Sequence, residues 1–329
     1  MKLGIIGSGT IVQEFLPKLC KLEGLEIKGI QGVTSQLDNI KKLCNENNVE
    51  LATDSFETLL QSGIDTLYVA VPNALHFEYC KKGLENGMNI IVEKPMTSND
   101  HEANTLANIA KEKGLFLFEA ITTLYLGNYK KIEEWLPRIG DIKIVQSQYS
   151  QYSRRYDVFQ KGEILPVFDP KYSGGALMDL NLYNLHYVMG LFGKPEHYHY
   201  YPNIERNIDT SGMLVLQYPN FVALCLAAKD SKGSVGGIIQ GTKGCIKSTF
   251  PPNLVGEVRL ELNDGTVETF DDQDQFQRVI PEFKTFIQAI NNHNLEYCYK
   301  QLDKSLQVCK VQTGARLQAG IIFPGDQNV

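Results

Sequence analysis

Residues 2–12 read Lys-Leu-Gly-Ile-Ile-Gly-Ser-Gly-Thr-Ile-Val, and the fold class follows from this stretch. The apolar run over residues 2–6 stops at two closely spaced glycines, and a helical pattern follows. Gly7 permits a tight turn, and Gly9 lets the backbone approach a pyrophosphate at the helix N-terminus. Val12 occupies the position of the third glycine. Two glycines also occur in strand-to-helix turns that bind no nucleotide, for purely steric reasons. The place of the motif inside a βαβ unit favours dinucleotide binding.

Strand-like and helix-like segments alternate through the first 120 residues. The further strands are expected at residues 25–33, 65–71, 88–92 and 115–118, with helices at 39–47, 74–86 and 100–113. This alternation predicts a parallel, doubly wound sheet.

After Ala120 the pattern changes to one helix followed mainly by strands. The helix is expected at residues 129–136 and the strands at 142–149, 212–218, 221–228, 234–240, 258–262 and 267–270. Turn residues at 219–220 and 263–265 indicate hairpins, and helices at 276–291 and 305–319 are expected to cover one face. Asp274 or Gln275 is a candidate N-cap for the first of these helices. We therefore predict an α/β protein: a Rossmann domain with a doubly wound parallel sheet in residues 1–121, and a C-terminal α+β domain with a large open mixed or antiparallel sheet in 122–329.

Composition narrows the class of partner. A chain of 329 residues exceeds the usual size of one core, so two domains are expected. The net charge of −6 gives no general attraction to nucleic acid or to an anionic membrane, which favours a small-molecule partner. Seven scattered cysteines without a Cys-x-x-Cys pair suit a reducing compartment. No signal peptide precedes the first strand and no apolar run approaches a membrane span, so we expect a cytoplasmic protein.

The end of the second strand bears on the choice of cofactor. NAD-binding domains of this type usually carry an Asp or Glu there, but this chain has Thr34 and Ser35. Small hydroxyls can hydrogen-bond a 2′-phosphate, which favours NADP over NAD, although the arginine that often accompanies such a phosphate is missing. The alternative is that the two residues only form a polar turn.

Two polar segments follow later strands of the same sheet. Residues 71–76 read Val-Pro-Asn-Ala-Leu-His and residues 93–95 read Glu-Lys-Pro. Ligands of doubly wound sheets bind at the carboxyl ends of the strands. A lysine fixed before a proline could stabilise a developing alkoxide and lower the pKa of a nearby phenol, whereas a lysine taken alone is more often a surface residue.

Several spaced motifs together resemble the Gfo/Idh/MocA family, named for glucose-fructose oxidoreductase and inositol dehydrogenase. The Gly-x-Gly turn, Pro-Asn-x-x-His, Glu-Lys-Pro and Glu119-Ala120 have the order and spacing of that family. Residues 174–183, Gly-Gly-Ala-Leu-Met-Asp-Leu-Asn-Leu-Tyr, resemble a further family segment, and residues 320–326, Gly-Ile-Ile-Phe-Pro-Gly-Asp, are similar to the ending of its dihydrodiol dehydrogenase branch. The resemblance covers essentially the entire chain.

The resemblance implies hydride transfer between NAD(P) and a carbinol carbon of a sugar, cyclitol or diol. Lys94 and Tyr183 would form the catalytic pair, with a cis peptide expected between Lys94 and Pro95. Asp179, four residues before Tyr183, would share its helix face and orient the substrate hydroxyl. The expected cofactor-binding residues are Gly7, Ser8, Gly9, Thr10, Ile11, Thr34, Ser35, Pro72, Asn73, His76, Glu93 and Lys94.

The exposed face of the C-terminal sheet predicts an oligomer. Apolar residues alternate along two of its strands, at Val215 and at Val222, Leu224 and Leu226, and need a covering surface. A homodimer or a higher homo-oligomer would bury them.

Three departures from the family pattern concern the substrate rather than the fold. Asn181 replaces the usual glycine of the family segment, and Leu124 and Gly127 stand where the dihydrodiol dehydrogenase branch tends to carry arginine and has proline, respectively. His186 lies one turn beyond Tyr183 and is expected to be structural, and no metal site is expected at His197 and His199.

Two other functions stay open from the sequence alone. One is a regulatory sensor that keeps the fold and the nucleotide site. The other is reduction of a C=C or C=N bond, as in the distantly similar biliverdin reductases. Neither function would require Lys94, Asp179 and Tyr183 together.

Overall fold

The computed structural model describes residues 1–328, which form two compact units. The first unit contains Met1–Ala120 and Val279–Leu306, and the second contains Ile121–Arg278 and the chain from Gln307 onward. The first unit boundary, after Ala120, lies one residue before the sequence division into residues 1–121 and 122–329, and the 28 residues of Val279–Leu306 lie in the first unit.

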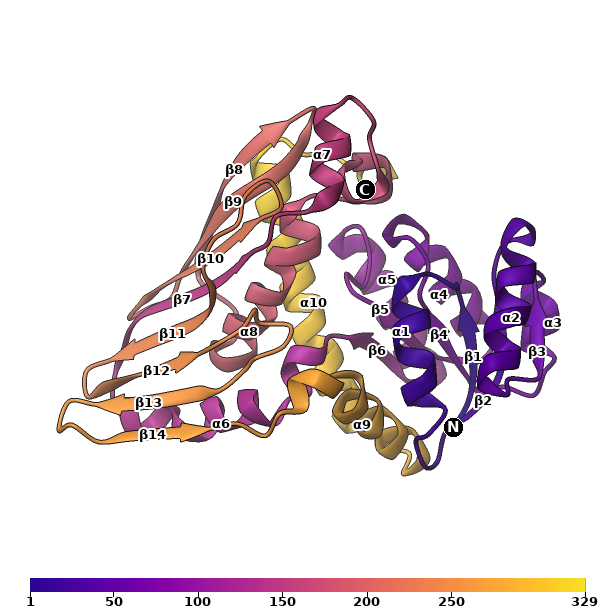
Figure 1. The fold of residues 1–329 in the computed structure, drawn as a ribbon, viewed down its shortest axis with the longest axis horizontal. Helices are drawn as coiled ribbons and strands as arrows, with labels where there is room; N and C mark the ends of the chain where they lie inside the picture. The colour runs from indigo at the N-terminus through magenta and orange to yellow at the C-terminus, as the bar shows by residue number, and fades with distance from the viewer. Residues whose placement is uncertain (329) are drawn as a thin grey trace. The chain divides into compact units, whose positions relative to one another are not determined.

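The first unit is built on a six-stranded parallel sheet with the order β3-β2-β1-β4-β5-β6 (Figure 1). The strand order reverses between β1 and β4, and ligands of doubly wound sheets bind at this point. The strands are β1 (Lys2–Ile6), β2 (Glu26–Gln31), β3 (Leu51–Thr53), β4 (Thr66–Val69), β5 (Asn89–Glu93) and β6 (Leu117–Ala120), and the helices are α1 (Thr10–Leu19), α2 (Leu37–Asn47), α3 (Phe56–Leu60), α4 (His76–Glu85) and α5 (Asp100–Lys113). The predicted Rossmann sheet is confirmed.

Helix α9 (Val279–Asn291) belongs to the first unit. The ring of Phe283 meets Tyr68 of β4 edge-on at 5.3 Å between centroids, and Phe286 stacks on Phe118 of β6 at 4.6 Å. The expectation that this helix covers the C-terminal sheet is wrong, because its aromatic face packs on the parallel sheet instead.

The second unit is built on an eight-stranded sheet with the order β14-β13-β12-β11-β7-β10-β9-β8. Strands β7 and β10 pair in parallel, and the other neighbouring strands pair antiparallel, so the predicted mixed sheet is confirmed. The strands are β7 (Ile142–Ser150), β8 (His197–Glu205), β9 (Ile208–Gln217), β10 (Val222–Ala228), β11 (Val235–Gly241), β12 (Gly244–Ser248), β13 (Val258–Leu262) and β14 (Val267–Phe270), and the helices are α6 (Gly127–Trp135), α7 (Arg154–Gln160), α8 (Leu182–Phe192) and α10 (Leu295–Gln318), with a π-helical turn, η7 (Leu177–Asn181), before α8.

One face of this sheet carries the core of the second unit. Helices α6 and α8 and the C-terminal part of α10 lie over it (Figure 1), and the side chains of Val145, Leu214, Leu216 and Cys225 are fully buried there. On the opposite face, alternate residues of the same strands are exposed or half-buried. Helices therefore cover one face, as expected.

Helix α10 begins at Leu295, whereas the expected start was residue 305. Cys298 and Leu302 are buried and extend its apolar face toward the N-terminus. The side chains of Asp274 and Gln275, the candidate N-caps, lie outside the described part of the structure.

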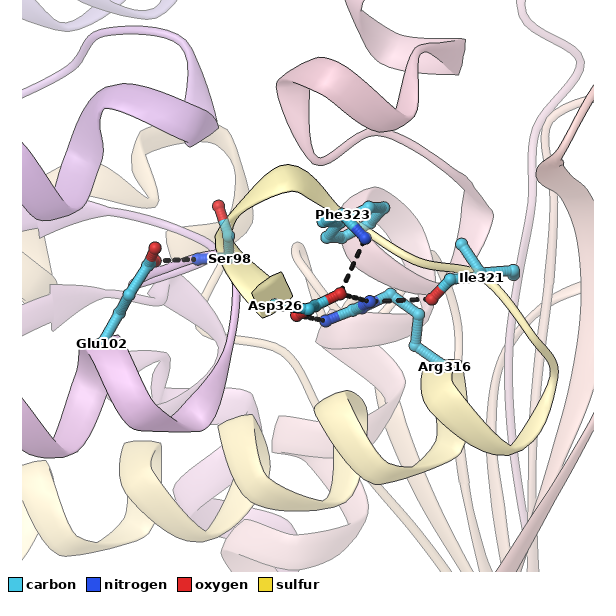
Figure 2. A network of polar contacts seen from close by, with 6 residues as sticks. All are labelled: Ser98, Glu102, Arg316, Ile321, Phe323 and Asp326. Atoms are coloured by element: carbon cyan, nitrogen blue, oxygen red, sulfur yellow. Dashed lines mark hydrogen bonds and ion pairs between the residues drawn. The ribbon is translucent and has the colours of Figure 1, made fainter. Parts of the chain in front are cut away.

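The end of α10 is fixed by an ion pair. Arg316, which is 1 % exposed, binds the Asp326 carboxylate through both terminal nitrogens, at 2.6 and 2.7 Å, and donates to the Ile321 carbonyl (Figure 2). Asp326 also accepts from the Phe323 N–H, and the Phe323 ring lies 3.9 Å from the guanidinium carbon. Residues 320–326 therefore fold back on α10.

Figure 2 also shows a contact within the first unit, in which the Ser98 N–H donates to the Glu102 carboxylate.

Candidate active site

The turn after β1 is shaped to admit a phosphate. Gly7 has φ = +108°, and a Cβ at this position would lie 2.2 Å from the Ala70 carbonyl oxygen, so no other residue fits without distortion. A Cβ at Gly9 would meet nothing within 4 Å. Gly9 is the N-cap of α1 and has no side chain to cap the helix, and the first turn of α1 contains no acidic residue, so its N–H groups are suited to an anion.

A cavity of about 490 Å³ adjoins this turn. It is lined mainly by apolar atoms, and its walls come from the carboxyl ends of β1, β2 and β4: Gly7, Ser8, Gly9, Gln31, Gly32, Val33, Gln36, Ala70, Val71, Pro72, Leu75 and Tyr79. The size, the place at the strand-order reversal and the anion-binding turn fit a dinucleotide. Gly7, Ser8, Gly9 and Pro72 of the predicted set are thus brought together.

One of the two predicted phosphate-binding hydroxyls, that of Thr34, lies next to a carboxylate. Thr34 begins the short 3₁₀ turn after β2, and its Oγ1 donates to Asp54 Oδ2 at 2.8 Å. Asp54 follows β3, the parallel neighbour of β2, so the sheet brings it beside Thr34 across 20 positions of sequence. No sequence motif marks Asp54, because the acid of a nucleotide-binding domain is expected at the end of the second strand and Asp54 follows the third.

His76 joins two loops of the first unit. Its ring is fully buried, Nδ1 lies 2.8 Å from the Pro95 carbonyl oxygen and Nε2 lies 2.9 Å from that of Val71. Burial lowers the pKa of this imidazole, although the two carbonyls oppose the effect. Because a carbonyl only accepts, the neutral ring bonds one of the two loops that follow β4 and β5, and the imidazolium bonds both.

The Glu93-Lys94-Pro95 segment is held from both sides. The Tyr68 hydroxyl donates to Glu93, and the Met96 N–H donates to the buried Glu119 carboxylate at 2.9 Å. The Lys94–Pro95 bond is cis, as expected. Lys94 is half-buried and comes directly after β5.

In the second unit, two glycines and a buried acid set the start of the π turn. A Cβ on Gly174 would lie 2.7 Å from the Pro166 carbonyl oxygen, and one on Gly175, where φ is +105°, would lie 2.1 Å from Asp209 Oδ1. Asp209 Oδ2 accepts from the Leu177 N–H and from the Tyr200 hydroxyl, each at 2.6 Å. Gly175 is therefore needed so that the chain can pass this carboxylate, and Gly174 is needed so that it can pass the Pro166 carbonyl.

Asp179 and Tyr183 lie on consecutive parts of the segment that follows. Asp179 is in the π turn and Tyr183 is in the first turn of α8, so the α-helical spacing assumed for the pair does not hold between them. Asp179 Oδ2 accepts from Lys229 Nζ at 2.7 Å. The Tyr183 ring lies 6.0 Å from that of Tyr149, at an interplanar angle of 52°.

Asn181, at the glycine position of the family pattern, ties the same turn to the sheet. Its Nδ2 donates to the Cys225 carbonyl at 3.2 Å and its Oδ1 accepts from Asn184, which also bonds Ser147 and the Leu226 carbonyl. His186 is buried, with 1 % exposure. Gly127 is another residue that departs from the pattern of the related sequences. A Cβ at this position would lie 1.7 Å from the Asp272 carboxylate.

Two features are absent from the described part of the chain. No group of three or more His, Cys, Asp or Glu side chains is arranged to hold a metal ion. Within the same residues, no helix combines the length and apolar character needed to span a membrane.

Comparison with known proteins agrees with this geometry. Residues 1–121 match the model for the NAD-binding Rossmann fold of an oxidoreductase family, and residues 136–314 match the model for the C-terminal alpha/beta domain of the same family. The chain belongs to the Gfo/Idh/MocA oxidoreductase family. It resembles scyllo-inositol 2-dehydrogenase (NADP(+)) of Bacillus subtilis, with 29 % identity over 99 % of both chains, and trans-1,2-dihydrobenzene-1,2-diol dehydrogenase of Mus musculus, with 26 % identity over 78 % of this chain and 82 % of the relative.

Two solved structures are also similar to this chain. A 3-ketoreductase from Actinomadura kijaniata, solved with NADP and TDP-benzene, gives a TM-score of 0.83 at 22 % identity over 97 % of both chains. Levoglucosan dehydrogenase, solved with NADH and levoglucosan, gives 0.80 at 17 % identity over 97 % of both chains. At these identities the comparison shows the shared fold.

Proposed function

We propose that this protein is an NADP(H)-dependent dehydrogenase that moves a hydride between nicotinamide and a carbinol carbon of a cyclitol, sugar or diol. Each unit supports the proposal by itself: the first has a dinucleotide cradle, and the second has a held carboxylate, Asp179, four residues before a tyrosine. Similarity to an inositol dehydrogenase and a diol dehydrogenase supports the substrate class.

The cofactor would bind along the carboxyl edge of the parallel sheet. Residues Gly7–Ile11 would hold the pyrophosphate at the start of α1, and Thr34 and Ser35 would contact the adenosine phosphate. Pro72, Asn73, His76, Glu93 and Lys94 would shape the nicotinamide end. The bound cofactor accepts or supplies the hydride.

The chain's own residues would handle the proton. Hydride leaves a carbinol carbon readily only if the hydroxyl proton is removed in step, and a phenol with an ordinary pKa of about 10 is a poor base at neutral pH. In this proposal Tyr183 exchanges that proton, the Lys94 ammonium favours the phenolate, and Asp179 orients the substrate hydroxyl.

The test is a turnover assay with purified protein. scyllo-Inositol, myo-inositol, glucose, levoglucosan and trans-dihydrobenzenediol would each be incubated with NADP⁺ or NAD⁺, and formation of the reduced cofactor would be followed. Turnover of at least one polyol is expected. Binding of NADPH without oxidation of any of these substrates would contradict the proposal and favour the sensor.

We also propose that two copies of the chain associate through the uncovered face of the eight-stranded sheet. Leu224 of β10 lies opposite Val215 of β9, and Leu226 of β10 lies opposite Met213 of β9. Met213, which is 49 % exposed, lies opposite Tyr201 of β8, which is 60 % exposed. This apolar row extends across three strands, and a second copy would cover it.

We place the enzyme in the cytoplasm. All seven cysteines are free thiols, and Cys44, Cys80, Cys225, Cys298 and Cys309 are buried. This usage fits a reducing compartment.

A further inference from the structure

Lys229 is a buried lysine at the carboxyl end of β10, directly after Ala228. Its side chain is 3 % exposed. The backbone on either side is fixed, since the Lys229 N–H donates to the Thr210 carbonyl at 2.8 Å and the Lys229 carbonyl accepts from the Ser153 N–H at 2.9 Å. The direction of this side chain is therefore set by the sheet.

The ammonium group has three defined neighbours. Nζ lies 2.7 Å from Asp179 Oδ2, 3.1 Å from the Val167 carbonyl oxygen and 4.9 Å from the centre of the Phe168 ring. A buried ammonium without such partners would be strongly unfavourable. Of the three, Asp179 is the one that carries a charge and also retains solvent access, with 32 % of its side chain exposed.

The surroundings of this pair are rigid. Val167, which accepts from Lys229, also accepts from the Gly175 N–H at 3.0 Å, and Gln312 donates to the Leu177 carbonyl at 3.0 Å. Asp209 holds the Leu177 N–H from the other side. The backbone that carries Asp179 is thus fixed, and the remaining freedom of its carboxylate is rotation of the side chain.

Burial of a cation at this position has a cost that a stability role does not explain. Replacing a buried ion pair by well-packed apolar residues is often neutral or stabilising, so an ion pair with one buried member is weak evidence for stability. A half-exposed carboxylate held by a buried ammonium is instead suited to present a fixed acceptor to a ligand.

We infer that Lys229 is a positioning residue for the reaction: its ammonium fixes the Asp179 carboxylate in the orientation that receives the substrate hydroxyl. The inference rests on the proposed function, in which Asp179 contacts the substrate. Lys229 itself acts through Asp179 and exchanges no proton with the substrate.

The test is a double-mutant cycle in the full-length protein with NADP⁺ and scyllo-inositol, or the best polyol of the panel above. Lys229→Met should lower kcat/KM about 100-fold, the loss expected for a reacting group misplaced by about 1 Å, while the Kd for NADPH changes less than about twofold. In the Asp179→Asn background the same change should cost less than about threefold. Lys229→Arg, which keeps the charge, should retain activity within about tenfold of the unsubstituted protein.

Equal losses from Lys229→Met in both backgrounds would overturn the inference and leave Lys229 a structural residue. If the unsubstituted protein turns over no polyol, the proposed function fails separately. The positioning claim is then decided by crystal structures of the unsubstituted and Lys229→Met proteins: a carboxylate that rotates away in the variant supports it, and an unchanged Asp179 orientation overturns it.

Discussion

Tyr183 is the side chain on which the proposed chemistry depends most directly. Tyr183→Phe removes the hydroxyl and keeps the ring that packs at 6.0 Å from Tyr149. Because positioned acid–base catalysis contributes ~10²–10⁴-fold, we expect kcat to fall by about that factor, with NADPH affinity nearly unchanged. Steady-state kinetics and fluorescence titration with NADPH would measure both quantities.

Tyr149→Phe is the matched control, since it alters the neighbouring ring in the same way and has no assigned role in proton transfer. It should retain most of the turnover. Near-normal kcat in Tyr183→Phe would transfer the proton role to another group, and His186 would be examined first.

Asp54 is a residue through which cofactor preference can be tested. Its carboxylate accepts from Thr34, the proposed contact of the adenosine phosphate, and a negative charge there opposes a 2′-phosphate. Asp54→Asn should therefore shift the ratio of NADPH to NADH affinity toward NADPH, by roughly threefold to tenfold for a solvent-screened charge. Calorimetric titration with each cofactor gives the ratio, and an unchanged ratio would show that the phosphate binds elsewhere.

Sequence reasoning reaches some residues of the candidate site and not others, for a physical reason. Gly7, Gly9, Lys94, Asp179 and Tyr183 stand in local motifs whose spacing can be read along the chain. The groups that act on them come from distant strands: Lys229 meets Asp179 across 50 positions, and Asp54 meets Thr34 across 20. Strand order sets such contacts, and a single sequence carries no direct signal of them.

Strand β9 is joined to the π turn by one buried carboxylate. Burial raises the pKa of Asp209 to about 6, against an ordinary value of 3.8, even though Tyr200 and Leu177 donate to it. Between about pH 4 and pH 6 the unfolded chain has released this proton and the folded protein has not. The free energy of unfolding contributed by Asp209 therefore falls as the pH rises through that window, by up to about 3 kcal/mol, and is constant above it.

Asp209→Asn removes this titration and keeps an oxygen that can accept from the Leu177 N–H. The difference in unfolding free energy between the unsubstituted protein and the variant, measured by urea denaturation, should thus decrease from pH 4 to pH 6 and then level off. A difference independent of pH would mean that Asp209 is ionised throughout.

The helices and strands show where periodicity suffices and where it fails. Long elements with a clear apolar pattern, such as α5 and β10, lie within a few residues of their expected positions. Strand β3 has three residues, too few for a period to show. The π turn was read as α-helix, because a widened turn depends on Asp209 and the glycines around it rather than on local propensity.

For the entire protein, the uncovered sheet face gives a test of assembly. Leu224→Lys places a charge in the middle of the apolar row and should convert the proposed dimer to a monomer, as measured by light scattering after gel filtration. Val267→Lys on β14 is the control, since Val267 is 50 % exposed on the edge strand at the other end of the sheet order. A dimer that persists in Leu224→Lys would place the interface elsewhere.

The path of the chain limits how such a protein can be recombined. The chain passes between the two units three times, after Ala120, after Arg278 and after Leu306, and the last passage falls inside the 24 residues of α10. A chimera with one splice after Ala120 would combine the parallel sheet of one parent with the α9 of the other, and Tyr68 and Phe118 would meet foreign aromatic partners. Exchange of the second unit between relatives therefore requires that residues 279–306 remain with the parent of the first unit, so the segment to be exchanged is discontinuous in sequence.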